Sequence, residues 1–234
     1  MSPLSASYLA GREPANKQVS PPTGSGHYER DDNVPLTCQP LYVIKKSWAD
    51  VPANVTNGIV TSHAGASSAG TTTKTPNGSL ASSGVATLTP ARNVVITVTH
   101  SSSVVAMSGT ITGKRFGRAV TEAWSVSAGT TSKTFTGAVA FDTVTSITEV
   151  VAANASANTV IMGTGKVLGL DFKCAFVQPV AESEDGAAPT TGALVKASSS
   201  ANADARGTYA PNSAPNGSLD FEVAYLAEDL STIY

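Results

Sequence analysis

The side chains that could act as acids, bases, nucleophiles or metal ligands are spread thinly along this sequence. The three histidines, His27, His63 and His100, fall in three different stretches, and no His-Glu-x-x-His motif is present. No Gly-x-Ser-x-Gly turn presents a serine nucleophile, and no Cys-x-x-Cys pair offers a structural zinc site. The sequence therefore predicts that the protein is not an enzyme, with no catalytic residue and no bound metal.

Carboxylates occur in two groups that deserve a test as acid pairs or cation ligands. Three are the available candidates for the paired acids of a glycosidase: Asp142, Glu149 and Asp171. Three more follow in a Pro/Gly/Ala-rich stretch: Glu182, Glu184 and Asp185. The spacing of the second group does not match an EF-hand loop, so a solvated acidic loop is predicted there.

A glycine-rich run and a basic cluster complete the candidate chemistry. Gly163-Thr-Gly-Lys166 has part of a phosphate-binding loop, but Val167 replaces the Ser or Thr and the first glycine is missing. We therefore predict a glycine turn between two strands and no cofactor. The basic residues Lys114, Arg115 and Arg118 surround a glycine turn and are expected to be a solvated loop tip.

Bulk charge and hydropathy exclude two classes of partner. A net charge of −2 with no larger basic cluster argues against nucleic-acid binding, which needs clustered Lys and Arg. No apolar run reaches the roughly 18 residues of a membrane span. We expect neither a nucleic acid nor a membrane as partner.

The elements that would position these residues are short strands. Val94, Ile96 and Val98 alternate with polar residues, the period of two that a half-buried strand requires. The same pattern, with Gly- and Ser/Thr-rich turns, predicts strands at these ranges: 41–48, 59–62, 93–100, 103–112, 118–127, 131–136, 139–151, 158–162, 166–177 and 218–226. The fold class expected is all-β, an antiparallel β-sandwich or jelly-roll-like barrel with an extended N-terminal arm.

The strand pattern divides the expected body, residues 41–234, into four parts after the first strands. Residues 63–90 are a low-complexity Gly/Ser/Thr stretch, expected as a long loop or as short edge strands held by others. Residues 91–177 hold the core strands, residues 178–217 are loop-rich, and residues 218–226 form a late strand. Pro-Asn-Gly-Ser-Leu occurs twice, at 76–80 and 215–219, and both copies are predicted to be reversals.

Residues 1–40 carry six of the thirteen prolines, which exclude a central strand or a long helix. This segment is expected to be an extended arm whose sparse apolar side chains dock on another surface. The candidate partner-binding residues are Leu4, Tyr8, Leu9, Val19, Tyr28, Val34 and Leu36. Reaching across a neighbouring subunit, strapping over its own domain, and plain disorder all remain open.

Composition and cysteine usage bear on where such a chain works. Charged residues make up only 14% of the chain, and Ser and Thr about a quarter, which suits a surface packed against neighbours or an extracellular β-domain. The start, Met-Ser-Pro-Leu-Ser, lacks the features of a secretion signal, so use without export is expected. Buried thiols are then favoured for Cys38 and Cys174, although a disulfide between them stays open.

Several strand-and-turn runs together resemble structural proteins of tailed bacteriophages. The runs are Val94–His100, Gly113–Glu122, Gly129–Phe135, Phe141–Ile147, Gly163–Leu170, Arg206–Asn212 and Leu219–Val223. The likeness is greatest to capsid decoration (cement) proteins. It implies a non-enzymatic virion protein on the capsid surface, assembled in the host cytoplasm, with the major capsid protein as partner and a homo-oligomer, favoured as a trimer, as the working form.

Two other functions stay open at this stage. The phage structural proteins that this sequence resembles also include tail or fibre components. A low copy number per virion would indicate such a component. A carbohydrate-binding domain for host attachment is the third reading. An exposed aromatic cluster beside carboxylates would favour that reading.

Overall fold

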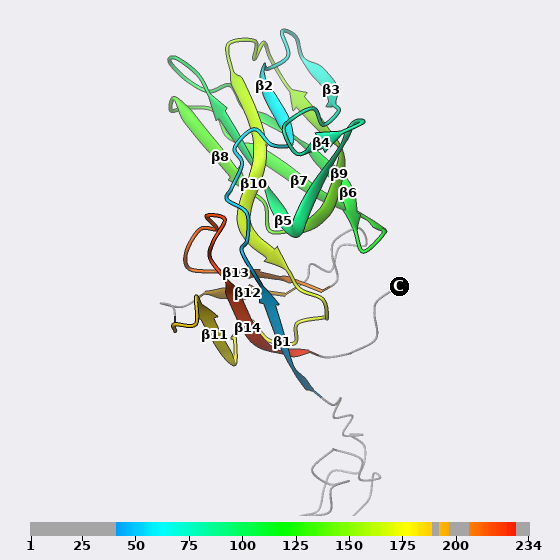
Figure 1. Ribbon diagram of the computed structural model, residues 1–234. Coiled ribbons are helices and arrows are strands. Elements are labelled where there is room, and N and C mark those ends of the chain that lie inside the picture. The colour runs from blue at the N-terminus through cyan, green and yellow to red at the C-terminus, as the bar shows by residue number, and fades with distance from the viewer. Residues whose placement is uncertain (1–40, 189–191, 197–205, 228–234) are drawn as a thin grey trace, which may run out of the picture. The chain divides into compact units, whose positions relative to one another are not determined.

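Alternating burial along extended segments defines this fold, seen here in a computed structural model that describes residues 41–188, 192–196 and 206–227. The described residues form antiparallel strands and no helix, which confirms the all-β fold class. The chain divides after Tyr42, and the unit Val43–Tyr234 contains every strand apart from the first residue of the first one. Figure 1 shows these strands in the order of the chain.

Fourteen strands are present in the described ranges. They are β1 (Tyr42–Trp48), β2 (Val60–Ala64), β3 (Gly70–Lys74), β4 (Ala81–Ser82), β5 (Val85–Thr99), β6 (Met107–Arg115), β7 (Arg118–Val126), β8 (Ser132–Thr136), β9 (Phe141–Val151), β10 (Thr159–Gly169), β11 (Ala181–Glu184), β12 (Ala193–Val195), β13 (Thr208–Ala210) and β14 (Phe221–Ala227).

Eleven of these strands form one large curled sheet organised around β5. Its main path is β12-β13-β10-β5-β9-β6-β7, and β2, β3, β4 and β8 pair at the sides. The second half of β5 pairs with β10 and β8, whereas its first half pairs with β9 and β4. The register of β5 against β9 shifts between Thr87 and Arg92, around Pro90, which has no N–H to donate. Because β5 changes neighbours along its length, the sheet bends around a core.

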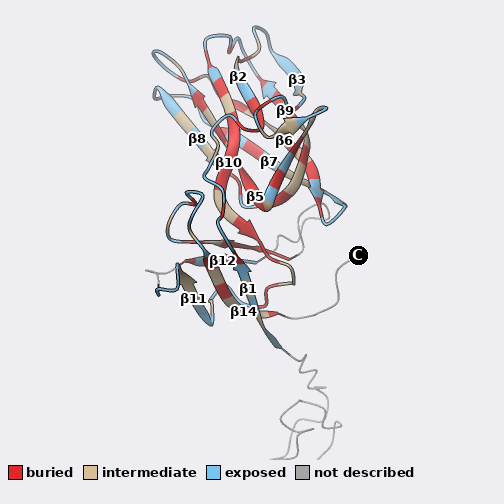
Figure 2. Cartoon of the chain, viewed as in Figure 1, coloured by how far each residue is buried: buried red, intermediate tan, exposed pale blue. Residues whose placement is uncertain are grey.

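The predicted core positions are confirmed along the central strands. Val94, Ile96 and Val98 are fully buried, and Trp124 shares its buried face with Val120. Further buried core residues are Met107, Ile111, Val126, Phe141, Val144 and Ile147. Figure 2 shows the resulting alternation of buried and exposed residues along the strands. Burying these side chains supplies the main stabilisation of the large sheet.

A second core forms beneath a small sheet with the order β1-β14-β11. Phe221, Val223 and Tyr225 of β14 are buried at every second position, as the sequence predicts for a two-faced strand. The indole of Trp48 stacks on Tyr209 with the ring centroids 6.0 Å apart. The expected body therefore contains two hydrophobic clusters, and β10 runs from the first to the second.

The predicted turn at Gly163–Gly165 is wrong, because β10 continues through it as one strand and ends at Gly169. A Cβ on Gly163 would lie 1.9 Å from the main-chain oxygen of Val55. The glycine is thus required because another segment crosses the strand closely. A register shift between Thr164 and Leu168 marks the same irregular region.

The two stretches expected to be loop-rich contain strands. Residues 63–90 include β3, β4 and the start of β5, which agrees with short edge strands held by longer neighbours. Residues 178–217 include β11, β12 and β13, which are too short to give a periodic signal. Of the two Pro-Asn-Gly turns, the second has a glycine with positive φ, 96° at Gly217, and the first does not.

Candidate functional site: an anchored linker and an apolar sheet face

Two of the glycosidase candidates meet at one arginine. Nη1 of Arg115 lies 2.6 Å from Oδ1 of Asp142, and Nη2 lies 4.0 Å from Oδ1 of Asp171. Asp171 also pairs with Lys46 at 2.7 Å. The expectation that Arg115 sits in a solvated tip is wrong, since its side chain is only 5% exposed. Both carboxylates therefore belong to a network of alternating charges.

The same network lines an open hollow of about 360 Å³. The two-residue turn between β6 and β7 places Phe116, with φ of 49°, in the lining of the hollow, and this residue is 40% exposed. The guanidinium carbons of Arg115 and Arg206 each lie 3.9 Å from the centre of this ring. The main-chain N–H of Phe116 donates to Asp142, which fixes the turn. The hollow therefore combines charged side chains with apolar and aromatic ones.

The third glycosidase candidate, Glu149, is buried elsewhere. Its Oε1 lies 2.5 Å from Nε2 of His63, and its Oε2 lies 3.7 Å from Nζ of Lys74. Because His63 Nδ1 also faces an acceptor, the oxygen of Thr61 at 3.1 Å, the imidazole bridges two acceptors. No group of three or more metal-ligating side chains occurs among the described residues. The arrangement joins β2, β3 and β9 and has the character of a structural ion pair.

The acidic stretch predicted to be a solvated loop instead holds the small sheet in place. Glu182 accepts the N–H of Gly192 at 2.9 Å and the hydroxyl of Tyr209 at 3.0 Å. Burial, followed by this hydrogen bond, raises the pKa of Tyr209. Glu184 accepts the N–H of Ser213 at 3.0 Å. These carboxylates satisfy backbone donors of neighbouring segments, so the solvated-loop expectation is wrong.

The segment that joins β1 to β2, residues 49–59 (the linker), is held along its length. Arg92 of β5 is buried and donates through Nη1 to the oxygen of Pro52 at 2.7 Å and through Nη2 to Asn54. Its Nε donates to the oxygen of Gly165 at 2.9 Å. Burial lowers the pKa of Arg92 to about 10. All these acceptors are uncharged, so the guanidinium serves to bind backbone.

Other contacts hold the two ends of the linker. Val51 exchanges backbone hydrogen bonds with the second Pro-Asn-Gly-Ser-Leu turn, through Leu219 at 3.1 Å and Gly217 at 2.9 Å. The N–H of Val55 donates to the side-chain hydroxyl of Thr164 of β10, and the oxygen of Val55 accepts the N–H of Thr164, both at 3.0 Å. The linker is therefore bonded to β5, to β10 and to the turn before β14, and β1 itself pairs with β14 in the small sheet.

The outer face of the small sheet is unusually apolar at one end. Four large apolar side chains on or beside this sheet are more than half exposed: Val43 (64%), Phe176 (51%), Val177 (61%) and Val180 (55%). Together they are called the apolar patch below. Soluble proteins rarely leave such side chains exposed together unless another surface covers them.

The predicted partner-binding residues of the arm lie outside the described residues. The structure adds candidates that sequence reasoning missed, namely Arg92 as an anchor and the apolar patch as a surface. An isolated arginine between Ala91 and Asn93 in an apolar strand was the available signal for the anchor. No such signal existed for the patch, because an exposed valine looks like a core valine in sequence.

Comparison with known proteins gives no match to a family model, to a curated protein or to a solved structure. The described residues contain no helix long and apolar enough to cross a membrane.

Proposed function

We propose that this chain is a non-enzymatic virion structural protein of a tailed phage, a capsid decoration protein that bridges neighbouring capsid subunits. The observation that carries the proposal is the anchored linker. In a protein that bridges two others, the segments that contact the partners must be firmly attached to the folded body. Here β1, which begins at Tyr42, pairs with β14, and the linker that follows it is bonded to β5, β10 and the turn before β14.

The proposed mechanism needs no chemistry beyond binding. A subunit that binds only the assembled shell stabilises that shell by mass action. When one rigid body makes several weak contacts, the first contact brings the others close to their sites, so the overall affinity for the shell rises. The major capsid protein is the proposed partner and the capsid surface the proposed location. A homo-oligomer, with the trimer favoured by the resemblance, would multiply the contacts.

Virion occupancy tests this proposal with a matched pair of variants. A chain lacking residues 1–40 is expected to lose most of its capsid occupancy, measured as copies per purified virion. The variant Lys114→Gln removes one exposed charge and should bind as the parent chain does. Unchanged occupancy after the deletion would remove the arm from the mechanism, and a copy number of a few tens or fewer, with label only on tails, would indicate a tail component.

The hollow beside Phe116 favours one further candidate, a carbohydrate-binding role in host attachment. It places an exposed aromatic ring beside two carboxylates, Asp142 and Asp171, whose side chains are about one-third exposed. Carboxylates and guanidinium groups hydrogen-bond sugar hydroxyls, and the exposed part of the Phe116 side chain offers apolar contact for sugar C–H groups. A glycan array probed with the full chain tests this role, with Asp171→Asn as the weakened variant. A blank array would reject it.

A further inference from the structure

The pentapeptide Pro-Asn-Gly-Ser-Leu occurs twice, at 76–80 and 215–219, and each copy contains an asparagine followed by glycine. In such a pair the main-chain nitrogen of the glycine can attack Cγ of the asparagine, because no Cβ shields that nitrogen. The attack closes a succinimide ring and is the usual route by which asparagine loses ammonia. Since the two copies have the same local sequence, any difference in their reactivity must come from the fold.

In the second copy the asparagine side chain is folded forward over its own turn. Oδ1 of Asn216 accepts the N–H of Ser218 at 2.9 Å, the hydroxyl of Ser218 at 3.1 Å and the N–H of Leu219 at 3.0 Å. These donors come from the two residues that follow Gly217. The amide group is therefore held over the stretch of main chain that contains the attacking nitrogen, which favours ring closure by proximity.

The same three donors also act on the charge that develops in the reaction. When the nitrogen of Gly217 bonds to Cγ, negative charge builds on Oδ1 of Asn216. Hydrogen-bond donors that are already directed at that oxygen stabilise this charge, as in an oxyanion hole. Both residues are exposed, and nothing lies within 4 Å of a Cβ built on Gly217. The ring therefore has room to form, and water can reach it.

In the first copy the asparagine is held in a different way. Oδ1 of Asn77 accepts the N–H and the hydroxyl of Thr61 of β2, at 3.0 and 3.2 Å, so its amide is directed toward another strand. The N–H groups of Asn77 and Gly78 both donate to the oxygen of Ile59 at 3.0 Å. A Cβ on the buried Gly78 would lie 2.3 Å from the main-chain oxygen of Asn57. The backbone of this copy has no room to rearrange.

Two further comparisons complete the contrast. The N–H of Gly217 donates to the oxygen of Val51 at 2.9 Å, much as that of Gly78 donates to Ile59, so this bond does not separate the two copies. The third Asn-Gly pair, at 57–58, is enclosed like the first copy. Its glycine is buried, and a Cβ there would lie 2.8 Å from Cδ1 of Leu80.

We propose that Asn216 is a site of spontaneous deamidation, which the fold selects over Asn77 of the identical pentapeptide. The nitrogen of Gly217 loses its proton to solvent and bonds to Cγ of Asn216. The Cγ–Nδ2 bond then breaks, and Nδ2 takes up a proton and leaves as ammonia. Water opens the succinimide at either carbonyl, which gives aspartate or isoaspartate at position 216. Water is the only co-reactant.

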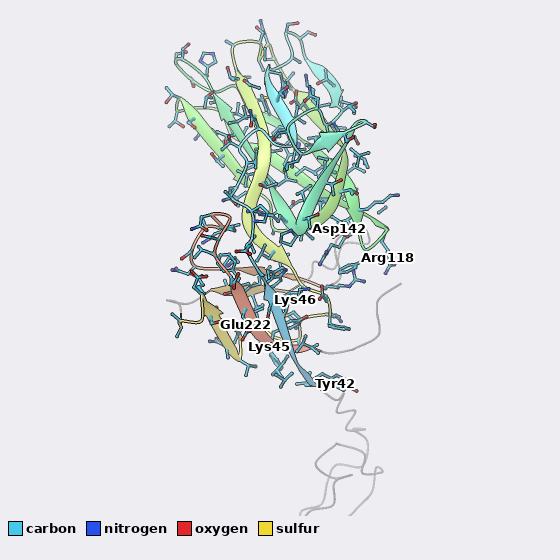
Figure 3. The ribbon with its side chains drawn as sticks, viewed as in Figure 1. Tyr42, Lys45, Lys46, Arg118, Asp142 and Glu222 are labelled. Carbon is cyan, nitrogen blue, oxygen red and sulfur yellow. The ribbon has the colours of Figure 1, made fainter. Side chains whose placement is uncertain are left out.

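The reaction would change the contact that holds one end of the linker. Val51 donates to the oxygen of Leu219 at 3.1 Å and accepts the N–H of Gly217 at 2.9 Å. In the succinimide the nitrogen of Gly217 has no hydrogen, and isoaspartate adds one methylene to the main chain, so the two bonds lose their register. They lie where β1 ends and β14 begins, the adjacent strands on which Figure 3 labels Lys45 and Glu222. Deamidation therefore loosens the linker beside the small sheet.

This inference stands apart from the proposed function, because it needs neither a capsid nor a partner. The test incubates the full folded chain at mildly alkaline pH and follows each copy by proteolysis and mass spectrometry, which separates asparagine, aspartate and isoaspartate. The flanking residues of the two copies differ, so their peptides are distinguishable. We expect Asn216 to react at least about tenfold faster than Asn77, because only its amide is held over its own turn.

The same chain unfolded in guanidinium chloride is the reference, and there the two asparagines should react at similar rates. Three results would overturn the proposal. The first is a rate at Asn77 equal to or above that at Asn216 in the folded chain. The second is a difference of the same size in the unfolded chain, and the third is an Asn216 that stays intact when folded.

A matched pair of variants tests the role of the donors. Ser218→Ala removes one of the three donors and should slow the reaction at Asn216 about threefold in the folded chain. Ser79→Ala makes the same change at an exposed position of the first copy and should leave the rate at Asn216 unchanged. Thermal unfolding verifies that each variant folds, and the unfolded rate of each corrects for the substitution itself. An equal effect of Ser218→Ala in the folded and unfolded chains would reject the donors as the cause of selection.

Hydrogen exchange at the amide of Val51 measures the consequence for the linker. Exchange should be faster in chains that have deamidated at Asn216 than in fresh chains, because the partner of this amide belongs to the altered turn. Unchanged exchange would reject the loosening of the linker.

Discussion

Nη1 of Arg92 lies 2.7 Å from the main-chain oxygen of Pro52, and through this bond β5 holds the linker that leads to β1. The same guanidinium reaches Gly165 of β10 through Nε, at 2.9 Å. One side chain thus joins three segments that are far apart in sequence. Because it is buried and its acceptors are uncharged, its role is to satisfy backbone oxygens that would otherwise lie buried without donors.

Replacing Arg92 should loosen the linker and destabilise the fold. Arg92→Met keeps the length of the side chain but leaves the oxygens of Pro52 and Gly165 without this donor. We expect a loss of about 3 kcal/mol in the free energy of unfolding, measured by urea denaturation, because several buried acceptors lose a charged donor together. Hydrogen exchange should also speed up at the amide of Val55.

The control for Arg92→Met is Lys114→Gln, which removes a cation from an exposed position of β6. It should change stability by less than about 0.5 kcal/mol. Equal effects of the two variants would show that Arg92 is not an anchor.

Close crossing of the linker over β10 makes a prediction at Gly163. The variant Gly163→Ala would set a Cβ 1.9 Å from the oxygen of Val55, so the linker or the strand must move. We expect a destabilisation of about 3 kcal/mol, at the upper end of overpacking effects. Gly129→Ala is the comparison, since its Cβ would meet open space and only its φ of 101° opposes the change. Gly129→Ala should lower the free energy of unfolding by about 1 kcal/mol. If Gly163→Ala lowered it no further than that, the close crossing of the linker over β10 would be contradicted.

The central strands were predictable because their residues carry a local signal. Val94, Ile96 and Val98 alternate with polar residues, and that period survives whatever packs against them. The same holds for β14, where Phe221, Val223 and Tyr225 are buried as the pattern indicates. Each of these strands contains enough consecutive residues for a period of two to be recognised.

The misses have a common physical cause, which is that they depend on contacts between distant segments. Gly163 and Gly165 look like a turn in sequence, yet the first is a glycine because Val55 crosses it. Glu182 looks like part of a solvated loop, yet Tyr209 and Gly192 supply its donors. The exposure of Val177 likewise depends on whether a distant segment of the chain packs on its side chain. The sequence around each residue contains none of this information.

His63 and Lys74 both contact the buried carboxylate of Glu149, which allows a comparison of two contacts at different distances. His63 lies 2.5 Å from Oε1, whereas Lys74 lies 3.7 Å from Oε2, and the side chain of Glu149 is 0% exposed. We expect His63→Ala to reduce the free energy of unfolding by about 3 kcal/mol and Lys74→Ala by about 1 kcal/mol or less. Urea denaturation at pH 6 measures both. If Lys74→Ala lowered the free energy of unfolding more than His63→Ala, Lys74 and not His63 would be the main partner of Glu149.

Glu122 on β7 is a further carboxylate that points inward. Its Oε1 accepts the N–H groups of Ala138 at 2.6 Å and Val139 at 3.1 Å, whereas its Oε2 is buried without a hydrogen bond. Burial raises the pKa of Glu122 above its ordinary value of 4.5, and the two backbone bonds only partly oppose that rise. The protonated side chain is therefore favoured by folding.

This raised pKa predicts how stability changes with pH. A carboxyl whose folded pKa lies above its unfolded pKa contributes stability below about pH 4.5, and that contribution is lost as the pH rises through the folded pKa. Glu122→Gln removes this ionisation and retains an oxygen for Ala138 and Val139. We therefore expect the free energy of unfolding of the variant, relative to that of the parent chain, to rise by up to about 1 kcal/mol between pH 4.5 and pH 7.5 in paired urea denaturations. Glu222→Gln is the control, because its carboxyl has a lowered pKa and the sign should be opposite. A difference between Glu122→Gln and the parent that is constant with pH would mean that Glu122 does not titrate in this interval.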